Sequence, residues 1–321
     1  MSLARPVHIL TGYLGSGKTT LLSKLLREPA LADSAVVINE LGEVGLDHVL
    51  VDRGSEDDVV LLESGCLCCA LGNSLQETLE SLHDRRERGD VPPFARVVVE
   101  TTGVADPGPI AATLELDRAI SRHYRLSSIA TVVDGVNGMA HLDRFAEARR
   151  QVAVADNIVI SKRDIATAAA IAELESRLRS LNPYASFTPA VVFADMHIVR
   201  AGDMREHDHD HVDHDHLAEQ GIVTTTIRLS EPLDWGRYAA WVHWAQRTLG
   251  ERLLRMKGAV RMADGEARAL HGVLRLFSAP QALASLPTGF GNGVVILITQ
   301  DVEARLLEEA RRRLVHGLES A

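Results

Sequence analysis

Residues 12–19 of the chain read GYLGSGKT, which matches the G-x-x-x-x-G-K-[ST] pattern of a phosphate-binding loop. A strand-like run, VHIL, precedes the loop, and a leucine stripe after it indicates a helix beginning at Thr19. Glycines let a backbone wrap closely around phosphates, and a helix N-terminus offers free N–H groups to an anion. We therefore expect Lys18 to reach the β- and γ-phosphates and the Thr19 hydroxyl to hold Mg²⁺. The alternative is a glycine-rich turn that only caps a helix. The predicted nucleotide-binding residues of the loop are Gly12, Gly15, Ser16, Gly17, Lys18, Thr19 and Thr20.

An acidic residue follows the next strongly apolar strand. Glu100 comes directly after ARVVV and opens the sequence ETTG. A carboxylate at the tip of a strand beside a phosphate-binding loop is placed to meet Mg²⁺ or its water shell. Gly103, three residues later, could turn its N–H toward a γ-phosphate. The alternative is that Glu100 ends a strand and caps a helix.

The segment SKRD, residues 161–164, follows a third predicted strand and is similar to the N-K-x-D segment of P-loop GTPases. In such a segment the aspartate accepts two hydrogen bonds from guanine, which adenine cannot donate. Asp164 therefore predicts a guanine nucleotide, and Lys162 would lay its aliphatic stem over the base. Ser161 replaces the usual asparagine, and we expect this to remove one tie to the phosphate-binding loop. Alternatively, Ser161 and Asp164 cap the next helix.

The cysteines form a single cluster. All three cysteines of the chain lie within four positions, at Cys66, Cys68 and Cys69. Residues this close seldom form a disulfide, and thiolates suit Zn²⁺ or Cu(I). Because there is no second cysteine pair, another ligand must complete the site, and Glu40 is the first candidate, ahead of Glu43 and Asp47. A redox thiol pair and inert buried cysteines remain as alternatives.

The net charge of −10 is unevenly distributed, because the segment 203–219 contains seven acidic residues and one basic residue. The same segment holds five of the fourteen histidines, His207, His209, His211, His214 and His216. Alternating histidine and aspartate prevents compact folding but supplies many weak metal ligands. The segment therefore predicts a low-selectivity cation trap, and the alternative is a solvated acidic linker.

The first 200 residues alternate apolar strand-like runs with helical patterns, which predicts an α/β fold with a parallel sheet covered by helices on both faces. The strands are predicted over 7–10, 35–39, 96–100, 129–134 and 157–161, and the helices over 19–27, 74–88, 142–152 and 168–181. The later part predicts a smaller α+β domain with strands over 222–229, 252–262, 269–278 and 294–299 and helices over 235–249 and 302–316. In the first of these helices an aromatic stripe, which includes Tyr238 and Trp241, predicts a core face.

These patterns divide the chain into a nucleotide-binding domain over 1–201, a His/Asp-rich linker over 202–221 and a C-terminal domain over 222–321. No apolar run reaches the length of a membrane span, and the N-terminus lacks a signal-peptide pattern. We therefore expect a cytoplasmic protein that is not inserted in a membrane. The acidic net charge argues against nucleic acid as a partner.

Taken together, the motifs resemble those of the CobW family of P-loop GTPases, a group of metallochaperones. The resemblance rests on GYLGSGKTT, NELGEVGLD at 39–47, GCLCC at 65–69, ETTGVADP at 100–107 and SKRD, and it continues in LLRMKGAV and LHGVLRLF. It implies that Glu100 stands at the third GTPase motif and that Cys66, Cys68 and Cys69 bind zinc or a related ion near the nucleotide. This chain departs from the family at Leu41, where phenylalanine is usual, and at Ser161.

We therefore predict a GTPase that uses GTP and Mg²⁺, with Lys18, Thr19 and Glu100 as catalytic residues. It would couple nucleotide state to the binding of a transition metal, for which Zn²⁺ is the first candidate, and deliver the metal to a client metalloprotein. Cobalt handling for cobalamin synthesis and activation of a metalloenzyme remain alternatives within the family. Two hypotheses from other functional classes remain open: a metal buffer with vestigial GTP binding, and a small-molecule kinase. A homo-oligomer is compatible with the sequence.

Overall fold

The computed structural model describes residues 4–25, 33–39, 60–64, 73–188 and 221–316. The chain divides into two compact units, Met1–Arg177 with Ser186–Asp195 and Leu178–Ala185 with Met196–Ala321. The first unit holds a parallel sheet and the second an antiparallel sheet. Within the described ranges, none of the helices is both long enough and apolar enough to span a bilayer.

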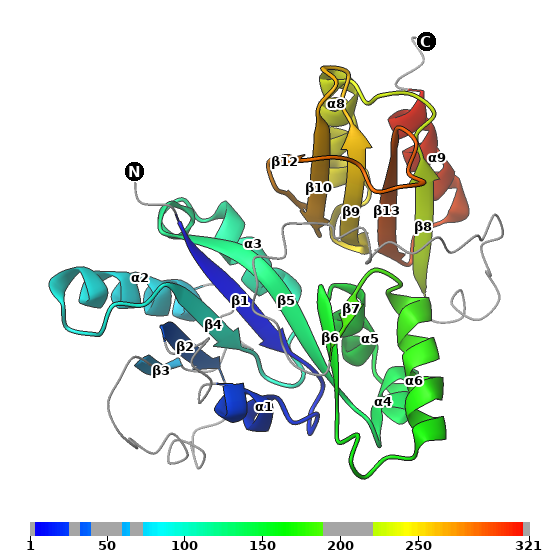
Figure 1. Cartoon of the computed structure of the whole chain (residues 1–321). Helices are drawn as coiled ribbons and strands as arrows, with labels where there is room; N and C mark the ends of the chain where they lie inside the picture. The colour runs from blue at the N-terminus through cyan, green and yellow to red at the C-terminus, as the bar shows by residue number, and fades with distance from the viewer. Residues whose placement is uncertain (1–3, 26–32, 40–59, 65–72, 189–220, 317–321) are drawn as a thin grey trace. The chain divides into compact units, whose positions relative to one another are not determined.

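The parallel sheet of the first unit has seven strands in the order β3-β2-β4-β1-β5-β6-β7 (Figure 1). Its strands are β1 Arg5–Thr11, β2 Ser34–Asn39, β3 Val60–Ser64, β4 Arg96–Glu100, β5 Tyr124–Asp134, β6 Asn157–Ser161 and β7 Ser186–Phe187. The central strands β1, β4 and β5 are rich in Val and Ile and are buried along most of their length, as expected for a sheet covered on both faces. The predicted parallel α/β fold is confirmed.

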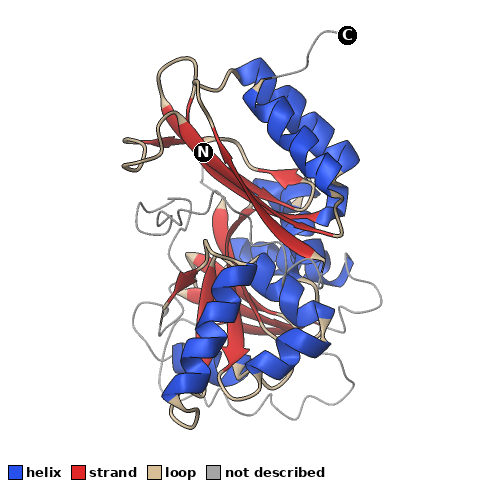
Figure 2. Ribbon diagram, turned by 90° about the vertical axis from the view of Figure 1, so that its right-hand side faces the viewer, coloured by secondary structure: helices blue, strands red, loops and turns tan. Residues whose placement is uncertain are grey.

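Helices lie on both faces of this sheet (Figure 2). They are α1 Lys18–Leu25, α2 Asn73–Arg88, α3 Pro107–Leu116, α4 Gly138–Arg144, α5 Ala146–Ala153 and α6 Ala168–Leu181, with a 3-10 turn at Ile120–Arg122. Leu22 and Leu25 of α1 pack against Leu10, Val98 and Val132 of three neighbouring strands. This packing fixes the helix that begins at Lys18 close to the end of β1, where the phosphate-binding loop starts.

Three details of the first unit differ from the sequence prediction. The helix predicted over 142–152 is two helices, because Phe145 adopts an extended conformation (φ −119°, ψ 120°) between α4 and α5. The strands β3 and β7 and the helix α3 were not predicted. β5 begins at Tyr124 rather than at residue 129. Short edge strands such as β7 carry little local signal, since they exist through pairing with a neighbouring strand.

The second unit contains a six-stranded sheet in which neighbouring strands are antiparallel, with the order β11-β10-β9-β13-β8 and β12 paired to β10. Its elements are β8 Ile222–Arg228, α8 Trp235–Thr248, β9 Leu253–Arg261, β10 Ala267–Val273, β11 Leu276–Phe277, β12 Gln281–Leu283, β13 Gly293–Gln300 and α9 Ala304–Val315, with a 3-10 turn at Gly250–Arg252. The strand predicted over 269–278 is a hairpin, because Leu274 takes a left-handed conformation (φ 52°) between β10 and β11.

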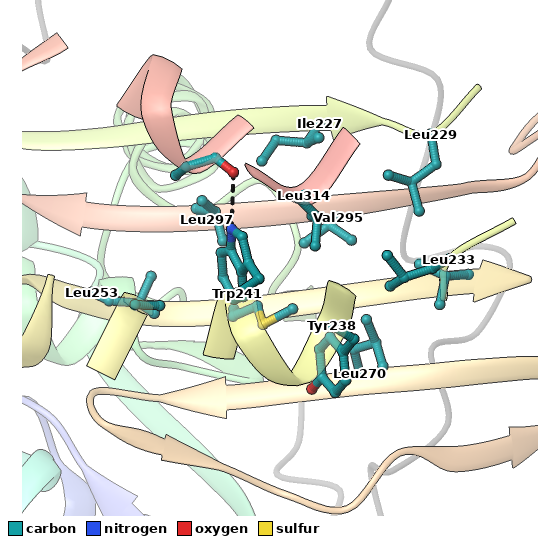
Figure 3. Close-up of a cluster of buried hydrophobic side chains, with 14 of the residues drawn as sticks. Ile227, Leu229, Leu233, Tyr238, Trp241, Leu253, Leu270, Val295, Leu297 and Leu314 are labelled. Carbon is teal, nitrogen blue, oxygen red and sulfur yellow. Dashed lines mark hydrogen bonds between the residues drawn. The ribbon is translucent and has the colours of Figure 1, made fainter. Parts of the chain in front are cut away.

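Helices α8 and α9 lie on one face of this sheet and enclose its core (Figures 2 and 3). Trp241 is the largest side chain there, only 1% exposed, and its indole N–H donates to the carbonyl of Ala310 at 2.9 Å. Its neighbours are aliphatic side chains from the strands and helices, which include Leu253, Leu270, Val295, Leu297 and Leu314. The prediction that the aromatic stripe of α8 is a core face is confirmed.

Candidate nucleotide-binding site

Four chain segments meet at the carboxyl edge of the parallel sheet. β1 leads into the loop 12–17, β4 ends at Glu100, β5 ends at Asp134 and β6 ends at Ser161. Since β4, β1, β5 and β6 are consecutive neighbours in the sheet, the four loops lie side by side. Ligands of open α/β sheets bind at this edge.

The loop 12–17 approaches the neighbouring strand very closely. A Cβ on Gly12 (φ 147°) would lie 2.2 Å from the carbonyl oxygen of Val132, so a larger residue cannot occupy this position without moving β5. Lys18 begins α1, is 8% exposed, and its Nζ donates to the carbonyl of Gly12 at 2.8 Å. The ammonium group is thus held over the loop at the helix N-terminus, where anions bind.

Thr19 and Glu100 bring two oxygen groups together across the sheet. The Thr19 hydroxyl donates to Oε1 of Glu100 at 2.6 Å, and the Glu100 side chain is only 3% exposed. Hydroxyl and carboxylate oxygens are the ligands that Mg²⁺ prefers. These two side chains therefore fit the predicted magnesium position. The alternative that Glu100 caps a helix is wrong, because the N-cap of α3 is Asp106, which accepts from the backbone N–H of Gly108.

The segment after Glu100 lies against the phosphate-binding loop. A Cβ on Gly103 would lie 2.7 Å from both the Cα and the backbone nitrogen of Leu14, so the two backbones touch at this point. The Thr101 hydroxyl donates to the hydroxyl of Thr11 at 2.9 Å, one residue before Gly12. The sequence reasoning named Gly103, and the structure places it beside the loop.

The SKRD loop is tied to the phosphate-binding loop through two side chains. The Ser161 hydroxyl donates to the carbonyl of Ser16 at 2.6 Å, and Nζ of Lys162 donates to the carbonyl of Gly15 at 2.8 Å. Lys162 has a left-handed backbone (φ 53°), which turns the chain toward Gly15. The expectation that Ser161 loses a tie to this loop is therefore wrong, because the two loops are close enough for a serine hydroxyl to bridge them.

The same loop leaves its aspartate available. Asp164 is exposed, and the helix that follows is capped by Thr167, whose hydroxyl accepts from the backbone N–H of Ala170 at 3.2 Å. The alternative in which Ser161 and Asp164 cap α6 is therefore wrong. Thr20 is also exposed, on the first turn of α1.

Asp134 is a site residue that the sequence reasoning missed. Its carboxylate pairs with Nζ of Lys162 at 2.7 Å and is 2% exposed. Burial would raise the pKa of this carboxyl, but hydrogen bonds from Lys162 and from residues 136–137 outweigh burial and lower the pKa to about 2. The ion pair fixes the direction of the Lys162 side chain. An acid at the end of a predicted strand was the available signal.

The metal site predicted from the sequence lies outside the described residues. This applies to Cys66, Cys68 and Cys69, to Glu40 with Glu43 and Asp47, and to His207, His209, His211, His214 and His216. Within the described ranges, no group of three or more His, Cys, Asp or Glu side chains is arranged to hold a metal ion. β2 ends directly before Glu40, and α2 begins four residues after Cys69.

Two family models match the chain. A family model described as "CobW/HypB/UreG, nucleotide-binding domain" matches residues 6–189. The chain belongs to the CobW/HypB/UreG family. A second model, "Cobalamin synthesis protein cobW C-terminal domain", matches residues 222–315. The resemblance found in the motifs is thus confirmed for both parts of the chain.

Individual members of this family cover most of the chain. The protein named zinc chaperone YjiA of Escherichia coli is 33% identical over 287 residues, which cover 85% of this chain and 87% of that protein. The zinc-regulated GTPase metalloprotein activator 1 of Schizosaccharomyces pombe is 34% identical over 187 residues, which cover 55% of this chain and 43% of that protein. The crystal structure of Zn(II)-bound YjiA GTPase from E. coli matches with a TM-score of 0.73 at 26% identity, over 97% of this chain and 98% of that one.

Proposed function

We propose that this protein is a GTP-hydrolysing metallochaperone that binds zinc and hands it to a client metalloprotein in the cytoplasm. The observation that carries the GTPase part is the tie between the SKRD loop and the phosphate-binding loop, through Ser161 and Lys162. It brings the residues for a guanine base and those for the phosphates to one sheet edge. The zinc part is supported by the cysteine cluster and by relatives that are named zinc chaperones.

In this proposal the phosphates of GTP lie in the loop Gly12–Lys18, against the N-terminus of α1. Lys18 exchanges its hydrogen bond with the Gly12 carbonyl for the β- and γ-phosphate oxygens and stabilises the charge that builds up on them. Thr19 and Glu100 would hold Mg²⁺, which would supply charge neutralisation on the phosphate oxygens. A water oxygen attacks the γ-phosphorus, the bond to the β–γ bridging oxygen breaks, the proton of the water passes to a phosphate oxygen, and GDP and phosphate leave.

Base recognition falls to the SKRD loop. Asp164 accepts hydrogen bonds from the two guanine N–H groups, which fits its exposed carboxylate. The Lys162 stem covers the base while its ammonium group stays fixed between Gly15 and Asp134. Because the same loop touches the phosphate-binding loop through Ser161, base and phosphates are held at a set separation.

Zinc is the cargo in this proposal. Cys66, Cys68 and Cys69 supply thiolate ligands, with Glu40 as a fourth ligand, and the histidine run of the linker 202–221 collects further ions weakly. Since Glu40 follows β2 directly, and β2 pairs with the strand that ends at Glu100, hydrolysis at one loop can alter the other.

The hydrolysis part is tested by measuring GTP turnover of the full chain and of Lys18→Ala. We expect turnover to fall by about 10²–10³-fold, the effect of removing one donor to a reacting oxygen. Lys24→Ala, an exposed lysine of the same helix, is the control and should leave turnover unchanged. A wild-type rate equal to that of Lys18→Ala would reject a GTPase and favour a metal buffer.

The metal part is tested by equilibrium binding of Zn²⁺ and Co²⁺ with GDP or a non-hydrolysable GTP analogue. We expect one tight zinc equivalent, lost in Cys66→Ser but kept when the histidine run is deleted. Its affinity should differ between the two nucleotide states by about tenfold, or about 1.4 kcal/mol. Equal affinity in both states would reject the coupling, and tighter binding of Co²⁺ would reassign the cargo.

A further inference from the structure

Gln151 of α5 is a buried polar side chain that the reaction as described does not use. The residue is 0% exposed, in a short helix whose other buried residues are Ala148, Val152 and Ala153. Burying an amide is unfavourable unless it is hydrogen-bonded, and an aliphatic side chain would pack there at lower cost. The reason for a glutamine at this position must therefore lie in its hydrogen bonds.

Its amide nitrogen binds the segment that follows Glu100. Nε2 of Gln151 donates to the carbonyl of Ala105 at 3.0 Å and to that of Gly103 at 3.3 Å. Both partners are carbonyl oxygens, so the orientation of the amide is determined by its surroundings. The residue before Gln151 makes a parallel contact, since Arg150 pairs with Asp106 at 3.0 Å. Two consecutive residues of α5 thus hold both ends of the stretch Gly103–Asp106.

The helix α5 is itself fixed to β5, beside the start of the phosphate-binding loop. The Thr131 hydroxyl of β5 donates to the backbone carbonyl of Gln151 at 2.7 Å, and Thr131 is the sheet partner of Thr11, next to Gly12. The Thr101 hydroxyl in turn bonds that of Thr11. Ser16 and Gln151 also line the same small cavity. The contacts therefore connect the segment after Glu100, the helix α5 and the start of the phosphate-binding loop.

We propose that Gln151, with Arg150 beside it, is a positioning residue for GTP hydrolysis. It holds the segment Gly103–Asp106 at a fixed distance from the phosphate-binding loop. This inference rests on the proposed GTPase activity. Gln151 does not lie among the residues assigned to phosphate or base, so its loss should slow the turnover of bound GTP far more than it weakens nucleotide binding.

The test is Gln151→Met in the full chain, which keeps the length of the side chain but removes both hydrogen bonds to Gly103 and Ala105. We expect kcat for GTP to fall by about 10–100-fold, because small displacements of reacting groups have effects of this size. The Kd of GDP, measured by calorimetry, should change by less than about threefold. Arg149→Met is the control, since Arg149 lies on the same helix but donates to the carbonyl of Leu142 at 2.7 Å.

An unchanged kcat, or a raised KM with unchanged kcat, would overturn the proposal. A purely structural role would lower the melting temperature of Gln151→Met without lowering kcat for the folded fraction, which also overturns it. If Gln151→Met does not fold, the half-exposed Arg150→Met decides the question: a reduced kcat with unchanged GDP affinity supports the proposal, and an unchanged kcat rejects it. If wild-type turnover only equals that of Lys18→Ala, the proposed function fails rather than this inference.

Discussion

The two units bury their polar groups in different ways. In the first unit, one group of buried polar side chains lies at the carboxyl edge of the sheet, and this group includes Lys18, Glu100, Thr101, Asp134 and Gln151. In the described residues 221–316, the buried polar side chains are Arg255, His271 and Thr299, and the main core around Trp241 is apolar except for single polar atoms.

This contrast distinguishes residues that serve the nucleotide site from residues that stabilise the fold. A buried polar group costs free energy unless it is bonded, so a group of them at the sheet edge where ligands of open α/β sheets bind indicates a functional site. The Trp241 indole shows the other case, because one hydrogen bond to the Ala310 carbonyl satisfies it and the rest of the ring contributes packing. Substitutions at the nucleotide edge should therefore change chemistry, and substitutions at the second core should change stability.

The largest expected effect is on the second core. Trp241→Ala removes a fully enclosed ring and leaves the Ala310 carbonyl without its donor, so the free energy of unfolding should fall by about 3–5 kcal/mol. Chemical denaturation followed by circular dichroism measures this change. Trp235→Ala on the same helix, at a side chain 41% exposed, should cost less than about 1 kcal/mol. If folded Trp241→Ala loses GTP turnover as completely as Lys18→Ala, the separation of roles is wrong.

A smaller effect is expected at the base-binding loop, in specificity rather than stability. Asp164→Ala removes the acceptor of two guanine hydrogen bonds, and hydrogen bonds to a charged group contribute about 1.5–3 kcal/mol. The preference for GDP over ADP in competition binding should therefore fall by about 10–100-fold. Arg163→Ala, next in the chain but paired with Glu175, should keep the preference. An unchanged preference in Asp164→Ala would remove the case for guanine.

The tie between the loops should have an effect of about one hydrogen bond. Ser161→Ala removes the donor to the Ser16 carbonyl, which contributes about 1 kcal/mol, so GDP should bind about fivefold more weakly. Ser161→Asn restores a donor of the type usual in the family and should recover most of the affinity. Nucleotide dissociation rates measure the difference. Equal rates in Ser161→Ala and wild type would show that the tie does not support binding.

The smallest expected effect concerns the opposite edge of the same sheet. His83 of α2 stacks on His123, just before β5, with ring centroids 3.7 Å apart. Burial, and then the neighbouring His123, lower the pKa of His83 below its ordinary value of 6.5, although Glu87 and Asp84 act in the other direction. The folded state then binds a proton less readily than the unfolded state.

Because folding lowers the pKa of His83, acid destabilises the folded state at this position. The stability contributed by neutral His83 is present above pH 6.5 and is lost as the pH falls below 6.5 toward the lowered value. Melting temperatures between pH 7.5 and pH 5 should therefore decrease less in His83→Gln than in wild type. His243→Gln, an exposed histidine of α8, should follow the wild-type curve. A steeper acid loss in His83→Gln would contradict the direction of the pKa shift.

Much of the nucleotide edge could be predicted because its signals are local. The phosphate-binding loop, Glu100 and the SKRD loop each follow an apolar strand, and parallel strands place their carboxyl ends together. The roles of Gln151 and Asp134 could not be predicted in this way. A helical pattern predicts a polar surface position at Gln151, but the residue is buried and bonded to the carbonyls of Gly103 and Ala105, far away in the sequence. The error at Ser161 has a similar origin, since the distance to Ser16 depends on how two loops approach each other.

The elements that were missed also depend on long-range pairing. β3 and β7 are edge strands that exist through β2 and β6, and their own residues carry weak signals. The break at Phe145 and the turn at Leu274 involve neither glycine nor proline, so no residue marked them. The domain limits drawn at 201 and 221 remain a proposal.

The position of the tryptophans determines which part of this protein its intrinsic fluorescence reports on. The three tryptophans of the chain, Trp235, Trp241 and Trp244, all lie on α8. Indole fluorescence therefore comes entirely from the second unit, and the nucleotide edge contributes none of it. A change in tryptophan fluorescence on adding GTP would therefore report a change in the surroundings of α8. If the fluorescence does not change, nucleotide binding must be followed with a labelled ligand.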